Sequence, residues 1–565
     1  MKTFKEFEYL RPDLTQAFTE VRAIIESFKA TEDKDEAVKF VHQYYEHMEK
    51  IDLMAELAMV RYTLNTQDPF YQAEQTFFDE QSPNIQQVKH EMNDAFLASK
   101  HRLALKEAFG TLTFERREQS KKTFHPDVMG LLKKENQLST EYSKLNASAS
   151  IEFDGKTLNL SMMAPYMSHQ DRNMRHQAQL AVSKFYETHE AHYDRIYDDM
   201  VKVRHEIALK LGYPSFIELA YDRLGRLDYT QQEVKTYREQ IIKYVVPIAT
   251  QMYEEQKSRI GVDTLYSYDV PFTFKSGPAK PKGNEAELLK AADHMYREMS
   301  PVTDEFFTFM RSRELLDLTA RKGKEGGGYC TLFPHIKVPF IFANFNGTSH
   351  DVDVLTHEAG HALQMYLSKD YLPEDRMPTM EAAEIHSMSM EFLAWPWMKL
   401  FFKEDTQKYY YQHLASAIKF LPYGALVDHF QHEVYKRPTM TPEERKQTYK
   451  QLERMYLPHM NYDDDAFLSK GTYWFKQGHI FQVPFYYIDY TLAQVIALEF
   501  WAKDQVNHEK TLETYISVCK TGGTKTFTDI LTSHGLSNVF EPNAINAIFK
   551  PVQQFLASMD VSSFT

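Results

Sequence analysis

The chain has 565 residues, 43% of them hydrophobic, and a formal net charge of −14. This length and content support a large core divided among more than one domain, and the acidic charge argues against nucleic acid or an anionic membrane as a partner. Only Cys330 and Cys519 are present, no stretch approaches about 18 apolar residues, and the acids near the start do not fit a signal peptide, so we expect a cytoplasmic location.

Helical periodicity dominates the chain. Apolar residues recur at intervals of three and four, with charges between them, in segments 41–61, 83–108, 178–210, 231–259 and 286–316. The sequence therefore predicts a mainly α fold.

A short hairpin interrupts the helices. Ser150–Phe153 and Thr157–Leu160 alternate in polarity around Asp154-Gly155, which is a turn signal. We expect this hairpin, near residues 150–160, to belong to an N-terminal helical domain of residues 1–195. Residues 196–565 would then form a second domain, which carries the motif described below.

Two further strands are expected at Gly326–Phe333 and Pro339–Asn346. If the second is an edge strand, its free backbone groups could pair with an extended peptide, which makes Ala343 and Asn344 candidate substrate contacts. Gly327 and Gly328 would let the first strand or its loop approach the peptide closely, although a plain turn explains these glycines as well.

A metal-binding motif follows these strands. Thr348 or Ser349 can cap a helix that carries His357-Glu358-Ala359-Gly360-His361. Imidazoles four residues apart share one helix face and suit zinc, and the carboxylate of Glu358 can take a proton from a water that zinc activates.

A catalytic zinc ion usually has three protein ligands, so a third donor should follow. The segment Met380–Leu393 predicts a second helix in which Glu384 and Glu391 share one apolar, buried face. Buried carboxylates are costly unless they are paired or bind a cation, so this helix is the expected source of the third ligand.

Other histidine pairs lack such an acid. His189 with His192 and His429 with His432 are spaced by three residues, and no apolar segment with an acid follows either pair. We therefore expect them to be ordinary residues on helix surfaces.

The motif residues resemble a known family. His357–His361 followed by Glu384 and Glu391 is similar to the thimet-oligopeptidase superfamily of zinc metallopeptidases, in particular its oligoendopeptidase F branch. Phe153–Leu160 resembles the N-terminal region of that branch, and His479–Tyr490 resembles its substrate-contacting segment.

The resemblance implies an elongated, all-helical metallopeptidase with a deep central channel between two lobes and a small β-sheet next to the zinc helix. It also implies the zinc ligands His357, His361 and Glu384, the general base Glu358, and His479, Tyr486 and Tyr490 as groups that stabilise the oxyanion. Which of Tyr486, Tyr487 and Tyr490 donates to the oxyanion is open, and Tyr487 is also a candidate substrate contact. Asp353 and Glu391 are candidates to orient the ligating histidines.

The expected function is that of a zinc endopeptidase with one Zn²⁺ per chain, which acts on short peptides and needs no obligate protein partner. Two other classes stay open: a helical scaffold whose zinc is structural, with four protein ligands, and a metal hydrolase of non-peptide amides. Removal of dipeptides from a terminus is a further alternative within the peptidases.

Overall fold

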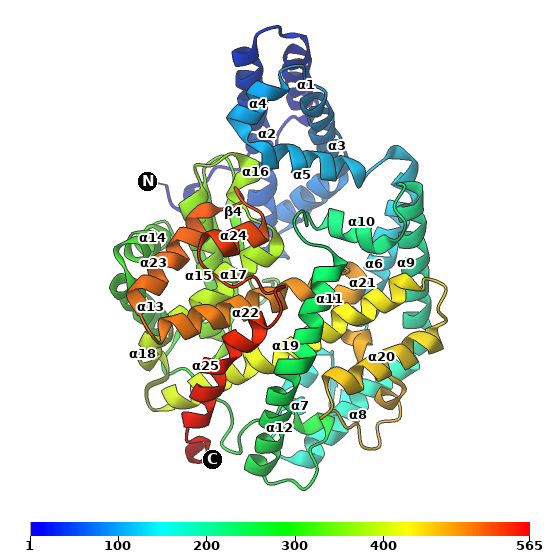
Figure 1. Ribbon diagram of the computed structural model, residues 1–565, viewed down its shortest axis with the longest axis vertical. Helices are drawn as coiled ribbons and strands as arrows, with labels where there is room; N and C mark the ends of the chain where they lie inside the picture. The colour runs from blue at the N-terminus through cyan, green and yellow to red at the C-terminus, as the bar shows by residue number, and fades with distance from the viewer. Residues whose placement is uncertain (1, 565) are drawn as a thin grey trace. The chain divides into compact units, whose positions relative to one another are not determined.

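The structure is a computed structural model and describes residues 2–564 (Figure 1). The chain forms two compact units, and each is built from three separate stretches. Unit 1 comprises Met1–Lys121, Lys280–Thr406 and Lys503–Leu536, and unit 2 comprises Lys122–Ala279, Gln407–Ala502 and Ser537–Thr565. The mainly α fold class is confirmed, whereas the division into residues 1–195 and 196–565 stays a prediction.

Unit 1 contains the N-terminal helices and the metal-motif helix. Its helices are α1 (Leu14–Ala30), α2 (Lys34–Leu64), α3 (Pro69–Leu97), α4 (Arg102–Phe109), α5 (Thr111–Lys122), α13 (Glu285–Met299), α14 (Pro301–Ser312), α15 (His350–Ser368), α16 (Pro373–Arg376), α17 (Met380–Leu393), α18 (Met398–Phe402), α23 (His508–Thr521) and α24 (Phe527–Ser533). Helices α1, α2 and α3 lie side by side in Figure 1 and pack around a core that includes Val21, Val41 and Val88.

The sheet of unit 1 has three strands in the order β3 (Leu316–Thr319), β5 (Val338–Phe345) and β4 (Tyr329–Phe333). β5 pairs in parallel with β3 and antiparallel with β4. The predicted strand at residues 339–346 is present as β5, but it is not an edge strand, because β3 occupies the side that would have been free. β4 is an edge strand of this sheet, and both β4 and β5 pack against α15.

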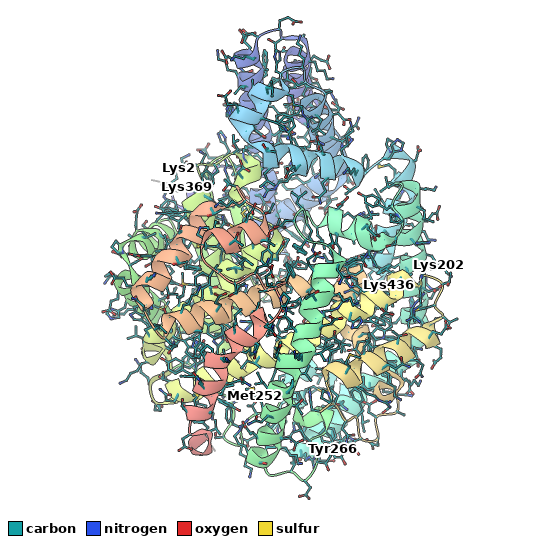
Figure 2. The ribbon with its side chains drawn as sticks, viewed as in Figure 1. Lys2, Lys202, Met252, Tyr266, Lys369 and Lys436 are labelled. Atoms are coloured by element: carbon teal, nitrogen blue, oxygen red, sulfur yellow. The ribbon has the colours of Figure 1, made fainter. Side chains whose placement is uncertain are left out.

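Unit 2 is also helical. Its helices are α6 (Met129–Ala147), α7 (Ala164–Met167), α8 (Arg172–Thr188), α9 (Glu190–Lys210), α10 (Phe216–Arg223), α11 (Gln231–Gln240), α12 (Val246–Ile260), α19 (Thr406–Lys436), α20 (Pro442–Tyr456), α21 (Gly478–Gln482), α22 (Tyr487–Asp504) and α25 (Ala544–Ser558). The predicted hairpin is present as β1 (Ile151–Phe153) and β2 (Lys156–Leu158). Lysines such as Lys202 of α9 and Lys436 of α19 point outward, as Figure 2 shows.

Several predicted helices are divided in the structure. The segment 178–210 is broken at His189, and the segment 286–316 is broken at Ser300, whose side chain accepts a hydrogen bond from the backbone N–H of Thr303. The segment 83–108 is also divided: it begins inside α3 (Pro69–Leu97), is interrupted after Leu97, and continues in α4 (Arg102–Phe109). Among the described residues, no helix combines the length and the apolar character needed to cross a bilayer.

Candidate metal centre

The metal-motif helix α15 is anchored to the end of β5. Ser349 is its N-cap residue, one of the two that the sequence predicts. The carboxylate of Asp351, in the first turn, accepts hydrogen bonds from the backbone N–H groups of Asn346 (2.9 Å) and Gly347 (2.7 Å). These two bonds connect the strand to the helix that carries the histidines and fix the direction in which the helix leaves the sheet.

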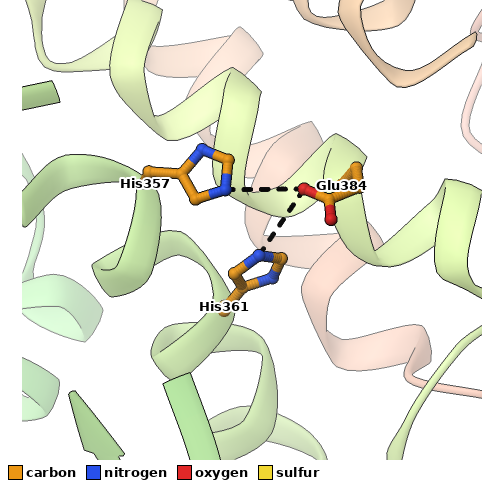
Figure 3. Close-up of side chains that lie close together, drawn as sticks. All are labelled: His357, His361 and Glu384. Atoms are coloured by element: carbon orange, nitrogen blue, oxygen red, sulfur yellow. Dashed lines mark ion pairs between the residues drawn. The ribbon is translucent and has the colours of Figure 1, made fainter. Parts of the chain in front are cut away.

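Two imidazoles and one carboxylate converge between α15 and α17 (Figure 3). Oε2 of Glu384 lies 3.5 Å from Nε2 of His357 and 3.6 Å from Nε2 of His361. The carboxylate of Glu384 is also held by the hydroxyl of Ser387, which donates to Oε2 at 3.0 Å. Two nitrogen donors and one oxygen donor therefore face a common point, and their number and type suit a divalent metal ion such as zinc.

His357 is oriented by a second carboxylate from α17. Its Nδ1 lies 2.7 Å from Oε1 of Glu391, which places a ring hydrogen on Nδ1 and directs Nε2 toward Glu384 and the proposed metal position. Of the two acids proposed for this role, Glu391 has this contact with His357. The role of Asp353 stays a prediction.

The close approach of α15 and α17 depends on Gly360. A Cβ atom at this position would lie 2.4 Å from the carbonyl oxygen of His386 and 2.7 Å from Cα of Ser387. Both are backbone atoms and cannot rotate away. The glycine inside the motif therefore lets the backbone of α17 come near enough for Glu384 to reach the two histidines.

Burial and the neighbouring charges together set the pKa values of the centre. It lowers the pKa of His361 to about 4, so this ring is neutral and offers a lone pair at neutral pH. Burial opposes ionisation of Glu384, but its hydrogen bond with His357 and the nearby imidazoles outweigh burial and lower the pKa of Glu384 to about 2. Burial raises the pKa of Glu358 to about 7.

The strand residues predicted to touch substrate have structural partners. The side-chain amide of Asn344 donates to the carbonyl oxygens of Glu325 and Gly327, each at 2.8 Å, so it holds the glycine segment beside β5. A Cβ atom on Gly328 would lie 3.6 Å from Oε1 of Glu358 and 3.2 Å from Cγ1 of Val354. The glycine segment therefore passes close to Glu358, while the side chain of Ala343 is buried.

A cavity of about 690 Å³ borders β4 within unit 1. Cys330, Thr331 and Leu332 of β4 line one side of it, and Lys89 and Arg116 are among the side chains on the helices around it. Neighbouring acids pair with these cations, as Asp52 does with Lys89 at 3.0 Å. This edge strand therefore lies beside a cavity that both charged and apolar side chains line.

His479 and its neighbouring tyrosines form a cluster in unit 2. The ring centroid of His479 lies 6.0 Å from that of Tyr486, 4.8 Å from that of Tyr487 and 5.9 Å from that of Tyr490. Tyr486 precedes the first residue of α22, and its ring packs 4.9 Å from that of Tyr490. The structure brings these four predicted residues together, while their placement relative to the metal centre of unit 1 stays a prediction.

Sequence reasoning missed two contacts. Ser387 lies three residues after Glu384, and the i, i+3 spacing on an apolar helix is a signal that could have identified it. The side-chain amide of Gln477 lies 2.8 Å from Nδ1 of His479, and nothing in the sequence pattern marks that glutamine.

Comparison with known proteins gives consistent results. A model of Peptidase family M3 matches residues 165–547, and a model of the Peptidase M3 N-terminal domain matches residues 4–124. Oligopeptidase PepF of Bacillus subtilis (strain 168) is 21% identical over 379 residues, which are 65% of this chain and 53% of that protein. An oligoendopeptidase F homolog of Borreliella burgdorferi is 23% identical over 402 residues, which are 68% of this chain and 65% of that protein.

Solved structures are similar over nearly the whole chain. A structure of PZ peptidase A with an inhibitor is 43% identical, covers 99% of this chain and 100% of its own, and gives a TM-score of 0.92. Oligoendopeptidase-F from Enterococcus faecium shares the fold at 16% identity, with a TM-score of 0.64 over 96% of this chain and 98% of its own. The two curated relatives, in contrast, are matched over only 53% and 65% of their own lengths.

Proposed function

Because this chain belongs to peptidase family M3, a family of metallopeptidases, we propose that it is a zinc-dependent oligoendopeptidase that hydrolyses internal bonds of short, unstructured peptides. The observation that carries this proposal is the position of the Glu384 carboxylate, with Oε2 3.5 Å and 3.6 Å from the two imidazole nitrogens of α15. A buried acid is costly unless a cation or hydrogen bonds compensate it, and this acid lies where a third zinc ligand is needed.

His357, His361 and Glu384 would hold one Zn²⁺. Three protein ligands of nitrogen and oxygen type are usual for a catalytic zinc ion and leave one coordination position for water. When bound, zinc polarises the scissile carbonyl group and lowers the pKa of water. A structural zinc site would need a fourth protein ligand, and the cluster of donors at this site contains three residues.

Glu358 would act as the general base and then as the general acid. Its carboxylate takes a proton from the attacking water as the oxygen of that water bonds to the scissile carbonyl carbon. The same carboxyl group then gives the proton to the amide nitrogen as the C–N bond breaks, so that one water molecule is consumed. Glu358 is buried beside Gly328, where a protein environment and not bulk water surrounds its carboxylate.

His479, Tyr486 and Tyr490 would stabilise the negative charge on the carbonyl oxygen by hydrogen bonding. Tyr487 is the alternative donor, since its ring also packs against that of His479. Losing one such donor costs about 100- to 1000-fold in turnover.

The edge of β4 is the proposed docking site for the peptide backbone. An edge strand offers unpaired N–H and C=O groups to an extended chain, and this pairing depends little on the side chains of the substrate. The cavity beside Cys330, Thr331 and Leu332 provides the space. Gly327 and Gly328 would border the scissile bond near Glu358, with Ala343 and Asn344 supporting them from β5.

One digest tests the activity. The substrate is a peptide of ten or so residues that is acetylated at one end and amidated at the other, and products are read by mass spectrometry. We expect cleavage at an internal bond, loss of cleavage after treatment with a chelator, and recovery on addition of Zn²⁺. Release of dipeptides only from peptides with a free terminus, or cleavage that survives removal of all metal, would contradict the proposal.

Removing the charge of Glu391 should weaken the metal centre without removing a ligand. In Glu391→Gln we expect zinc to bind about 10- to 100-fold more weakly, because the partner of His357 Nδ1 is no longer a carboxylate. Competition with a chromophoric chelator measures the affinity. Glu509→Gln, at an exposed glutamate in the first turn of α23, is the matched control, and equal weakening in the two variants would show that the contact of Glu391 has no special role.

A further inference from the structure

The hydrogen bonds around His479 determine which of its ring nitrogens carries a proton. Nδ1 lies 2.8 Å from Nε2 of Gln477, the residue two positions earlier. The other end of the same amide, Oε1, accepts a hydrogen bond of 2.7 Å from the hydroxyl of Tyr423 on α19. All three residues belong to unit 2, and two hydrogen bonds connect the phenol of Tyr423, the amide of Gln477 and the imidazole of His479.

The phenol assigns the orientation of the amide. Burial raises the pKa of Tyr423 well above its usual value, so its hydroxyl keeps its hydrogen. Within residues 2–564 the acceptor for that hydrogen is Oε1 of Gln477. A buried hydroxyl needs an acceptor, so the amide oxygen faces Tyr423 and the NH₂ group faces His479.

The amide in turn assigns the tautomer. An NH₂ group can only donate, so Nδ1 of His479 must accept with its lone pair. Burial also lowers the pKa of His479, which favours a neutral ring at neutral pH. A neutral ring whose Nδ1 is an acceptor carries its hydrogen on Nε2. His479 is half-buried, and its Nε2 has no hydrogen bond to the described residues of the chain.

We propose that Tyr423 and Gln477 are positioning residues that keep His479 in the Nε2–H tautomer, so that Nε2 donates a hydrogen bond to a substrate oxygen. This inference rests on the proposed function, in which His479 stabilises the oxyanion. It excludes His479 as a general base at that position, because Nε2 then has no lone pair to accept a proton. It also gives a role to the phenol of Tyr423 and the amide of Gln477 on the Nδ1 side of the ring.

The test is Gln477→Glu in the full chain. A carboxylate at position 477 can only accept a hydrogen bond, so Nδ1 of His479 should become the donor and carry the hydrogen of the ring. Nitrogen-15 NMR of protein labelled in its histidine rings reports the tautomer, with the signals of His479 identified by their loss in His479→Ala. We expect a pyridine-type Nδ1 and a pyrrole-type Nε2 in the unmodified protein, and a pyrrole-type Nδ1 in Gln477→Glu.

The variant should also acquire a new pH dependence. In the unmodified protein Nε2 carries a hydrogen in both the charged and the neutral ring, so titration of His479 leaves the donor in place. In Gln477→Glu the carboxylate raises the pKa of His479, and above that pKa the neutral ring has a bare Nε2. We therefore expect kcat to fall by about 100-fold as the pH rises through that pKa, with little change in KM.

The groups that face the ring of His479 are the phenols of Tyr486, Tyr487 and Tyr490 and the amide of Gln477. Burial is the cause that lowers the pKa of His479.

Gln482→Glu is the matched control. Gln482 lies on α21, three residues after His479, is exposed, and donates to Ser143 Oγ at 2.9 Å. This variant adds the same charge without touching the imidazole and should keep the tautomer and the pH profile.

Two results would overturn the inference: a pyrrole-type Nδ1 in the unmodified protein, or a Gln477→Glu protein with unchanged tautomer and pH profile. The tautomer assignments are independent of whether the chain is a peptidase, because the NMR signal requires no turnover. Failure of the proposed function would appear separately, as an absence of metal-dependent cleavage in the unmodified protein.

Discussion

Replacing Glu358 with glutamine should leave zinc bound and lower kcat by about 100- to 10,000-fold, the range that general acid–base catalysis contributes. Glutamine has nearly the shape of glutamate but no proton-accepting carboxylate, so the attacking water keeps its proton. Zinc content should not change, because the three proposed ligands His357, His361 and Glu384 are untouched. The measurement pairs turnover of a blocked peptide with metal analysis of the same sample.

The control for this variant is Glu509→Gln. Glu509 is an exposed glutamate in the first turn of α23, a helix that packs against α15 and α17, so the substitution removes one charge from the same unit. Its turnover should equal that of the unmodified protein. Near-normal turnover in Glu358→Gln, with zinc present, would show that another group moves the proton.

The second large effect is expected from Gly360→Ala. The added Cβ would lie 2.4 Å from the backbone oxygen of His386, so α15 and α17 must move apart. Overpacking of this kind costs about 1–3 kcal/mol, and it acts directly on the distance between Glu384 and the histidines. We expect zinc affinity to fall by about tenfold, since each 1.4 kcal/mol corresponds to a factor of ten, together with a lower thermal midpoint.

The matched control is Gly130→Ala, also a glycine within a helix. A Cβ on Gly130 would meet nothing within 4 Å in α6, so alanine should be accepted there and should favour the helix slightly. If Gly360→Ala bound zinc as tightly as the unmodified protein and melted at the same temperature, close packing of the two helices would not be what positions Glu384.

The candidate metal centre was largely predictable because its residue pattern is local in the sequence. His357 and His361 are four residues apart on one helix. Glu384 and Glu391 lie in an apolar segment, where a buried carboxylate is costly unless it is paired or binds a cation. Residue patterns alone did not choose between the two acids. The resemblance favoured Glu384 as the ligand, and the structure places Glu384 beside both rings and Glu391 on Nδ1 of His357.

Features that depend on distant segments were harder to predict. β5 is the central strand because β3 pairs with its other side. β3 is only four residues long, and the sequence analysis did not predict a strand there. The break at His189 has neither proline nor glycine to mark it. His432, expected on a helix surface, is 1% exposed, since Arg238 of another helix lies 2.8 Å from its Nδ1. The helix starts at Asp68-Pro69 and Ser300-Pro301 do carry a local signal, an N-cap residue followed by proline, which apolar periodicity alone did not use.

X-ray absorption at the zinc edge of the purified, full-length protein tests the central claim most directly. We predict one zinc ion per chain, surrounded only by nitrogen and oxygen at about 2.0–2.2 Å, with two imidazoles among the ligands and a signal that changes when Glu384 is replaced by alanine. A sulfur ligand near about 2.3 Å, or a zinc signal that is the same in the Glu384→Ala protein, would contradict the assignment of these three residues.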